Sequence, residues 1–132
     1  MILPTFKLPS WIESSTLLNV YLPPIAWAVV IFLFSSQSSL PSLSFSLPDF
    51  LLKKTAHLVV YAVLFFLVHR SLVIKKVATA SAWKAAFAIT LIYALTDELH
   101  QTFVPGRYGT LRDIGYDMLG AALAFLWKHR YI

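Results

Sequence analysis

Four long apolar segments alternate with short polar stretches along the chain, and these segments predict four helices. About 20 residues, at a rise of about 1.5 Å each, are needed to cross the hydrocarbon core of a bilayer. The sequence therefore predicts an all-α fold in which residues 1–132 form a single membrane domain, a four-helix transmembrane bundle. The predicted spans are roughly residues 20–36, 53–74, 77–100 and 111–128.

The start of the first helix has two interpretations. Ser10 and Glu13 have the spacing of a capping box, in which a hydroxyl and a carboxylate cap backbone N–H groups. A short interfacial helix over residues 11–22 would then end at Pro23-Pro24, because proline breaks a helix interior. One continuous, bent helix is the alternative.

Polar residues mark the other helix boundaries. The stretch Ser35–Pro48 is rich in serine and proline and carries no charge, which predicts a loop. Asp49 is the predicted N-cap of the second helix. Thr110 and Asp113 form a second capping box, which predicts the start of the fourth helix.

The composition favours a membrane protein. Of the 132 residues, 58% are hydrophobic and 13% are charged, whereas a soluble domain has about 45–50% apolar and about 25% charged residues. The absence of cysteine excludes disulfide bonds and thiolate metal sites. A net charge of +5 suits a topology signal better than nucleic-acid binding, because no basic patch is interleaved with aromatic residues. Met1–Ser10 lacks the features of a cleaved signal peptide, so the whole chain is expected to be mature.

The basic residues predict the orientation of the bundle. The connection Arg70–Lys84 contains four basic residues and no acidic residue, which makes it cytoplasmic by the positive-inside rule. With four spans, both termini are then cytoplasmic, and we expect a multi-pass protein of the cytoplasmic membrane. Seven of the eleven basic residues fall inside: Lys7, Arg70, Lys75, Lys76, Lys84, Lys128 and Arg130. Five of the six acidic residues fall on the outer half: Asp49, Asp97, Glu98, Asp113 and Asp117.

Three of the predicted helices carry polar stripes near their outer ends. Side chains three or four residues apart lie on one helix face, so a compact bundle can bring these stripes together. The stripes are Lys53, His57 and Tyr61; Tyr93, Asp97, His100 and Gln101; and Asp113, Asp117, Gly120 and Ala124. Ser35, Ser36, Gln37 and Ser38 of the first helix lie at the same depth. The sequence therefore predicts a polar pocket that faces away from the cytoplasm.

These residues also have purely structural interpretations. His57 would then hydrogen-bond a neighbouring helix, one lysine of Lys53-Lys54 would anchor the interface, and Asp113 would complete the capping box. Gly120 is interpreted as a packing residue. Asp117 lies inside the fourth helix, where a bare charge costs about 2–3 kcal/mol or more in a membrane. Its candidate partners are Arg107, Arg112, Lys54 and His57.

The predicted cluster is compatible with several kinds of chemistry. Asp97 and His100 have a carboxylate–imidazole spacing, but di-iron bundles need two such pairs and only one is present. A single Mg²⁺ or Zn²⁺ on His57, Asp113 and a carboxylate of Asp97-Glu98 is an alternative, and no metal ligand or cofactor is assigned. No nucleophile motif such as G-x-S-x-G occurs. Acid/base chemistry would depend on the burial of His57 or Glu98, so enzymatic activity stays open.

Arg107 and Arg112 give the clearest indication of a partner. Guanidinium groups favour phosphate and carboxylate, and a pocket level with the headgroups suits a lipid phosphate or pyrophosphate. The expected partners are membrane lipids, a lipid-linked phosphate or wall precursor, and a second copy of the chain in a homo-oligomer. Catalytic roles are predicted for His57, Glu98 and Asp113. Ligand-binding roles are predicted for Lys54, Tyr61, Asp97, His100, Gln101, Arg107, Arg112 and Asp117.

The pattern from the second to the fourth helix resembles VanZ-like membrane proteins. The resemblance is carried by Lys54-x-x-His57-x-x-x-Tyr61, Asp97-Glu98-x-His100-Gln101-x-Phe103-x-Pro105-Gly106-Arg107 and Asp113-x-x-x-Asp117-x-x-Gly120. The combination is specific, although each piece alone is weak. The polar residues of the family pattern correspond here to Lys54, His57, Glu98, Gln101, Arg107 and Asp113. Asp117 stands where many members have asparagine, which adds a charge.

The resemblance implies a small helical membrane protein of the cell envelope. The family takes its name from an accessory protein linked to resistance to teicoplanin and other glycopeptides. One hypothesis is a protein that binds or modifies an envelope lipid or lipid-linked wall precursor. Another is a non-catalytic membrane module in which the polar cluster is a structural network. A transporter is a third hypothesis, and a chain of 132 residues would need to form an oligomer for that role.

Overall fold

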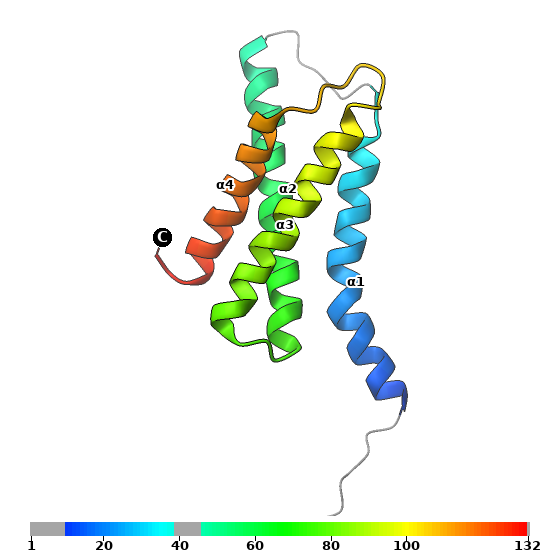
Figure 1. The fold of residues 1–132 in the computed structure, drawn as a ribbon, viewed down its shortest axis with the longest axis vertical. Helices are drawn as coiled ribbons and strands as arrows, with labels where there is room; N and C mark the ends of the chain where they lie inside the picture. The colour runs from blue at the N-terminus through cyan, green and yellow to red at the C-terminus, as the bar shows by residue number, and fades with distance from the viewer. Residues whose placement is uncertain (1–9, 39–45, 132) are drawn as a thin grey trace, which may run out of the picture.

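The computed structural model describes residues 10–38 and 46–131, and this part of the chain contains four α-helices and no strands (Figure 1). The helices are α1 (Ser10–Ser35), α2 (Ser46–Ile74), α3 (Thr79–Gln101) and α4 (Leu111–Lys128). The predicted all-α fold is therefore confirmed. The expectations for Met1–Ser10, including Lys7, and for the capping side chains of Ser10 and Glu13 fall outside the described residues and side chains.

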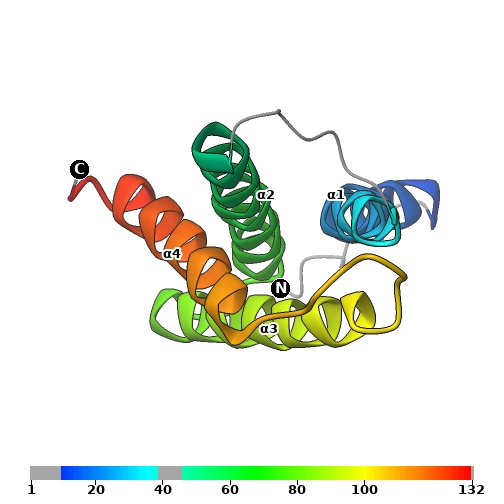
Figure 2. The same ribbon diagram turned by 90° about the horizontal axis from the view of Figure 1, so that it is seen from above.

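The four helices run alternately up and down (Figure 1). Seen from above, α2 lies between α1 and α4, and α3 runs along one side of the group (Figure 2). α2 contacts each of the other helices, and α3 also contacts both α1 and α4. Between the described residues of α1 and α4 there is no contact. The arrangement brings the upper turns of α2, α3 and α4 together, where the polar stripes were predicted to meet.

α1 is one continuous helix through Pro23-Pro24, so the interpretation as a single helix is confirmed and the predicted break does not occur. A proline lacks the N–H that would bond the carbonyl four residues earlier, which frees the carbonyls of Asn19 and Val20. Side chains of α2 replace the missing donors: Arg70 Nη1 donates to Asn19 O at 3.2 Å, and Ser71 Oγ donates to Val20 O at 2.6 Å. The helix continues because α2 satisfies the carbonyls that the prolines release.

α2 begins earlier than predicted. It starts at Ser46, so Asp49 lies in the first turn and is not the N-cap, and Ser46–Pro48 are helical although they were predicted as loop. Proline is tolerated in a first turn, where its missing N–H has no helical partner. A carboxylate in that turn is favoured by the helix dipole, and Asp49 also pairs with Lys53 at 2.7 Å. Residues 39–45 of the predicted loop lie outside the described residues.

α2 and α4 approach each other most closely at Gly120. A Cβ atom at this position would lie 2.0 Å from the carbonyl oxygen of Leu58, closer than two such atoms can come. Glycine is therefore required for the backbones to meet, in agreement with the interpretation of Gly120 as a packing residue. The surrounding core is formed by Ile31, Tyr61, Leu64, Phe65, Val68, Ala86, Ala94, Ile114 and Ala121.

The outer surfaces of α1 and α2 are apolar. The windows Leu17–Ser35 and Leu47–Ile74 are long and apolar enough to cross a membrane, and only 11% and 33% of them are buried. A core helix of a soluble protein would be mostly buried, so this exposure favours contact with lipid. Among the described residues, only these two helices are both long and apolar enough to cross a membrane. The arrangement with four membrane spans therefore stays a prediction.

Candidate functional site

Most of the predicted site residues meet in one place, between the upper turns of α2, α3 and α4. We call this group the polar cluster. It consists of Lys54, His57, Tyr61, Asp97, Glu98, Gln101, Arg107, Asp113 and Asp117, which are linked by the hydrogen bonds and ion pairs described below.

Lys54 of α2 forms an ion pair with Asp113 of α4. Both side chains are largely buried, with exposed fractions of 15% and 10%. The ammonium also lies 5.6 Å from the ring centroids of Phe50 and Tyr116. A charge removed from water needs a close partner, because the cost of desolvation is large. Asp113 therefore does more than complete a capping box, since its carboxylate neutralises a lysine on a neighbouring helix.

His57 and Asp117 make a second link between α2 and α4. His57 Nδ1 lies 2.8 Å from Asp117 Oδ1, and the Asp117 side chain is fully buried. The structure therefore selects His57 from the partners that the sequence offered for this aspartate. An imidazole held against a carboxylate is also an arrangement that can accept and return a proton.

Asp97 of α3 lies at the centre of a hydrogen-bonded chain. Its Oδ2 accepts hydrogen bonds from Tyr61 OH and from Gln101 Nε2, each at 3.2 Å. Gln101 Oε1 in turn accepts a hydrogen bond from Arg107 Nη2 at 2.9 Å. The amide thus stands between the guanidinium and the carboxylate. Because Tyr61, Asp97 and Gln101 are buried, this chain fixes the turn after α3 against α2.

Glu98 of α3 caps the beginning of α4. Its Oε2 accepts a hydrogen bond from Thr110 N at 2.7 Å, and the Thr110 hydroxyl accepts one from Asp113 N at 3.2 Å. One half of the predicted capping box is present, because the Thr110 hydroxyl caps Asp113 N. In the other half, Glu98 of α3 and not Asp113 accepts the hydrogen bond from Thr110 N. A Cβ atom on Gly109 would lie 2.0 Å from Glu98 O, so glycine permits this close approach.

Two carboxylate oxygens of the polar cluster have no hydrogen-bond donor among the described residues. They are Glu98 Oε1 and Asp117 Oδ2, and both are buried. His57, Glu98 and Asp117 each offer one ligand atom within 4.8 Å of the others. This set differs from the metal ligands considered from the sequence. Asp113 is instead paired with Lys54, and Asp97 is hydrogen-bonded to Tyr61.

His100 and Arg112 were predicted to bind ligand and lie apart from the polar cluster. His100 Nε2 lies 3.0 Å from Ser36 Oγ, and its ring centroid lies 4.7 Å from that of Phe32. The polar end of α1 therefore contacts α3 through His100. Arg112 is exposed at the start of α4, and its guanidinium lies 5.9 Å from the centroid of the Phe50 ring.

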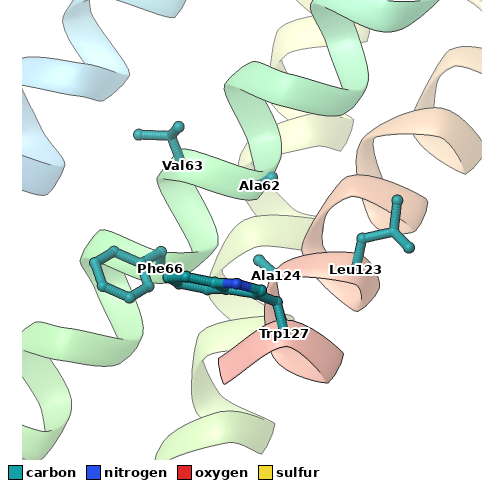
Figure 3. Close-up of a pocket in the computed structure, with 6 residues that line it drawn as sticks. All are labelled: Ala62, Val63, Phe66, Leu123, Ala124 and Trp127. Atoms are coloured by element: carbon teal, nitrogen blue, oxygen red, sulfur yellow. The ribbon is translucent and has the colours of Figure 1, made fainter. Parts of the chain in front are cut away.

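The hollows described in the structure lie lower in the bundle than the polar cluster. One, of about 430 Å³, lies between α2 and α4 and is lined by Ala62, Val63, Phe66, Leu123, Ala124 and Trp127 (Figure 3). We call it the apolar groove. Its largest side chains are Phe66 and Trp127, whose ring centroids are 6.4 Å apart. A second hollow next to it is lined in part by His69, Arg70 and Lys128.

The sequence did not indicate that Thr110 and Gly109 belong to the site. The backbone N–H of Thr110 binds Glu98, and Gly109 makes room for that contact. A signal was present, since a glycine directly precedes the capping residue. Its meaning depends on which helix supplies the facing carboxylate, which the spacing of residues along one chain does not show.

Long apolar helices that surround a buried polar cluster are typical of a helical membrane protein. The sequence pattern of the VanZ/LLP1 family matches residues 18–129, so the chain belongs to this family. The match covers α1 from residue 18 onward and all of α2, α3 and α4, and it confirms the resemblance to VanZ-like proteins. No curated protein and no solved structure matches the chain.

Proposed function

We propose that the protein crosses the cytoplasmic membrane four times and binds an anionic envelope lipid along α2 and α4. The phosphate of a lipid or lipid-linked wall precursor would lie at the outer end of these helices. One hydrocarbon chain would follow the apolar groove towards the cytoplasmic side. Both termini and the basic connection around Lys75 would then be cytoplasmic, and the polar cluster would lie near the outer face.

The exposure of the Arg112 side chain gives this proposal its main support. Three lysine and arginine residues were predicted to bind ligand, and of these Lys54 is paired with Asp113 and Arg107 is hydrogen-bonded to Gln101. Arg112 is exposed beside Phe50, at the same end of α4 as the polar cluster. An exposed guanidinium at the interface suits a phosphate, with which it forms two parallel hydrogen bonds.

The position of the apolar groove supports the same proposal. Arg112, Leu123 and Trp127 recur on α4 at intervals of eleven and four residues, which keeps them on neighbouring parts of one helix face. The distance along the helix from Arg112 to Trp127 is about 22 Å, at about 1.5 Å per residue. A hydrocarbon chain with its headgroup at Arg112 could therefore extend along α4 into the groove.

His57, Glu98 and Asp113 would serve this function by positioning the headgroup or by transferring a proton. The His57–Asp117 contact and the nearby Glu98 oxygen supply groups suited to acid/base chemistry. The link to glycopeptide resistance rests on membership of the VanZ/LLP1 family.

Native mass spectrometry of the detergent-extracted protein tests the lipid proposal. Samples would be exchanged into micelles that contain phosphatidylglycerol or polyprenyl phosphate. We expect wild type to retain one anionic lipid and Arg112→Ala to lose most of it. Lys84→Ala is the matched control, because Lys84 is also an exposed cation beside an aromatic ring, 5.6 Å from the Trp83 centroid. Equal retention by all three proteins would contradict lipid binding at Arg112.

A non-catalytic membrane module is the second candidate function. It is favoured by the extensive pairing within the polar cluster, where Lys54, His57 and Asp97 all have partners. Under lipid binding with proton transfer, Glu98→Gln should abolish function while the unfolding temperature is kept. Under the structural role, His57→Ala and Glu98→Gln should lower function and stability together. Thermal unfolding measured beside teicoplanin susceptibility of expressing cells distinguishes the two.

A further inference from the structure

Glu98 Oε1 and Asp117 Oδ2 are the least explained polar atoms of the polar cluster. Glu98 is 4% exposed and Asp117 is 0% exposed, and neither oxygen has a hydrogen-bond donor among the described residues. Each carboxylate uses its other oxygen, for Thr110 N and for His57 Nδ1 respectively. A buried acceptor left without a donor is unfavourable, so these two oxygens indicate a ligand or a proton between them.

The charge balance of this region also requires compensation. Two carboxylates approach each other, and His57 is the single basic side chain hydrogen-bonded to either of them in the described residues. The nearby Lys54 is already paired with Asp113. A divalent cation would neutralise both carboxylates and would provide the missing partner for each free oxygen.

We propose that His57, Glu98 and Asp117 bind a first-row divalent metal ion between α2, α3 and α4. Their ligand atoms lie within 4.8 Å of one another. Ligand atoms about 2.1 Å from a tetrahedral Zn²⁺ are about 3.4 Å from one another. The ligand atoms of the three side chains would therefore need to move together by about an ångström to bind the ion. One imidazole and two carboxylates favour Zn²⁺ over Mg²⁺, which prefers an all-oxygen shell.

Each proposed ligand comes from a different helix. His57 is on α2, Glu98 on α3 and Asp117 on α4. Imidazole and carboxylate ligands bind a metal only when they are deprotonated, so the affinity for the metal should fall as the pH falls. Three protein ligands leave a coordination position for water or for a phosphate oxygen. The inference does not depend on lipid binding at Arg112.

Zn²⁺ binding to the full chain in detergent tests the proposal. The protein would be treated with chelator, desalted and titrated with ZnCl₂. The metal that stays bound after a second desalting step would be measured by elemental mass spectrometry. We expect about one Zn²⁺ per chain, and an affinity at least tenfold lower in Glu98→Gln and in Asp117→Asn. Both amides preserve shape and can still accept the hydrogen bonds from Thr110 N and His57 Nδ1.

Two control variants separate this site from other ligands. Asp97→Asn changes a buried carboxylate whose described partners are Tyr61 and Gln101, and it should bind Zn²⁺ normally. His129→Ala should also bind normally, although His129 and His69 lie near each other, with ring centroids 6.3 Å apart. Visible absorption of the Co²⁺-loaded protein should change in Glu98→Gln and stay constant in both controls.

The results can overturn the proposal in two ways. Absence of bound Zn²⁺ in wild type would show that a proton, and not a metal, lies between Glu98 and Asp117. Equal binding by wild type and Glu98→Gln, or loss of binding in His129→Ala alone, would place the metal elsewhere. Circular dichroism shows whether each variant is folded. If Asp117→Asn is unfolded, Glu98→Gln decides the result, because its changed oxygen has no described donor.

Discussion

At the scale of single residues, two lysines that are adjacent in sequence have different surroundings. Lys54 is 15% exposed and paired with the buried Asp113, whereas Lys53 is 39% exposed and paired with Asp49 within α2. Loss of one partner from a buried pair costs about 3–5 kcal/mol, because the other charge stays buried and uncompensated. An exposed pair contributes only about 0–1 kcal/mol.

Lys54→Met should therefore destabilise the protein by several times as much as Lys53→Met. Thermal unfolding of the two variants in the same detergent measures the difference. The double variant Lys54→Met/Asp113→Leu should recover most of the loss, because it removes both charges together. Similar unfolding temperatures for the two single variants would mean that the pair of Lys54 and Asp113 contributes little.

The sequence predicted which residues form the polar cluster better than it predicted which of their side chains contact each other. The spacing of His57 and Tyr61 on one helix, and of Asp113 and Asp117 on another, predicted that polar faces would meet. Which residues pair depends on how far each helix is rotated and shifted against its neighbours. The contact of His57 with Asp117, and not with Asp113, is set by that rotation.

At the scale of the helix, α1 depends on donors that α2 supplies. Ser71 Oγ donates to the buried carbonyl of Val20, which lost its helical donor because residue 24 is proline. Ser71→Ala leaves this carbonyl without that donor and should cost about 1–3 kcal/mol. Pro24→Ala restores the backbone N–H, so the double variant should be more stable than Ser71→Ala alone. Equal unfolding temperatures for Ser71→Ala and the double variant would contradict this explanation.

The contact between α2 and α4 can be tested with two glycines of one helix. A Cβ at Gly120 would lie 2.0 Å from Leu58 O, whereas a Cβ at Gly115 meets nothing within 4 Å. Gly120→Ala should force the helices apart at a cost of about 1–3 kcal/mol. Gly115→Ala should be neutral or stabilise the helix by up to about 1 kcal/mol. Denaturant unfolding compares the two, and destabilisation of the same size in both would mean that the close approach is not required.

The helices were predicted more accurately in their number than in their boundaries. α3 and α4 begin and end close to the predicted spans, because charged and turn residues bracket their apolar segments. α1 and α2 extend further than predicted. Local rules treat Pro23-Pro24 and Pro48 as boundaries, whereas the helix continues through the first pair because Arg70 and Ser71 supply donors from α2.

At the scale of the whole molecule, charge is distributed unevenly along the bundle. The lower ends of the helices and the connection between α2 and α3 carry five basic residues and no acidic residue: Arg70, Lys75, Lys76, Lys84 and Lys128. The upper ends carry the acidic residues Asp49, Asp97, Glu98, Asp113 and Asp117 beside the basic residues Lys53, Lys54, Arg107 and Arg112. This asymmetry favours an orientation with the basic end in the cytoplasm. α3 and α4 are less apolar than α1 and α2, and three of their four acidic residues, Asp97, Asp113 and Asp117, are partnered by Tyr61, Lys54 and His57. Internal pairing of this kind lowers the cost of charges within a membrane.

Cysteine labelling tests whether four membrane spans hold the polar cluster near the outer face. The natural chain has no cysteine, so single cysteines can be placed at Ala78, Tyr108 and Tyr131, which are exposed beside the ends of α3 and α4. An impermeant maleimide should label Tyr108→Cys in intact cells, and should label Ala78→Cys and Tyr131→Cys only after permeabilisation. Labelling of all three positions from the same side would contradict the four-span account.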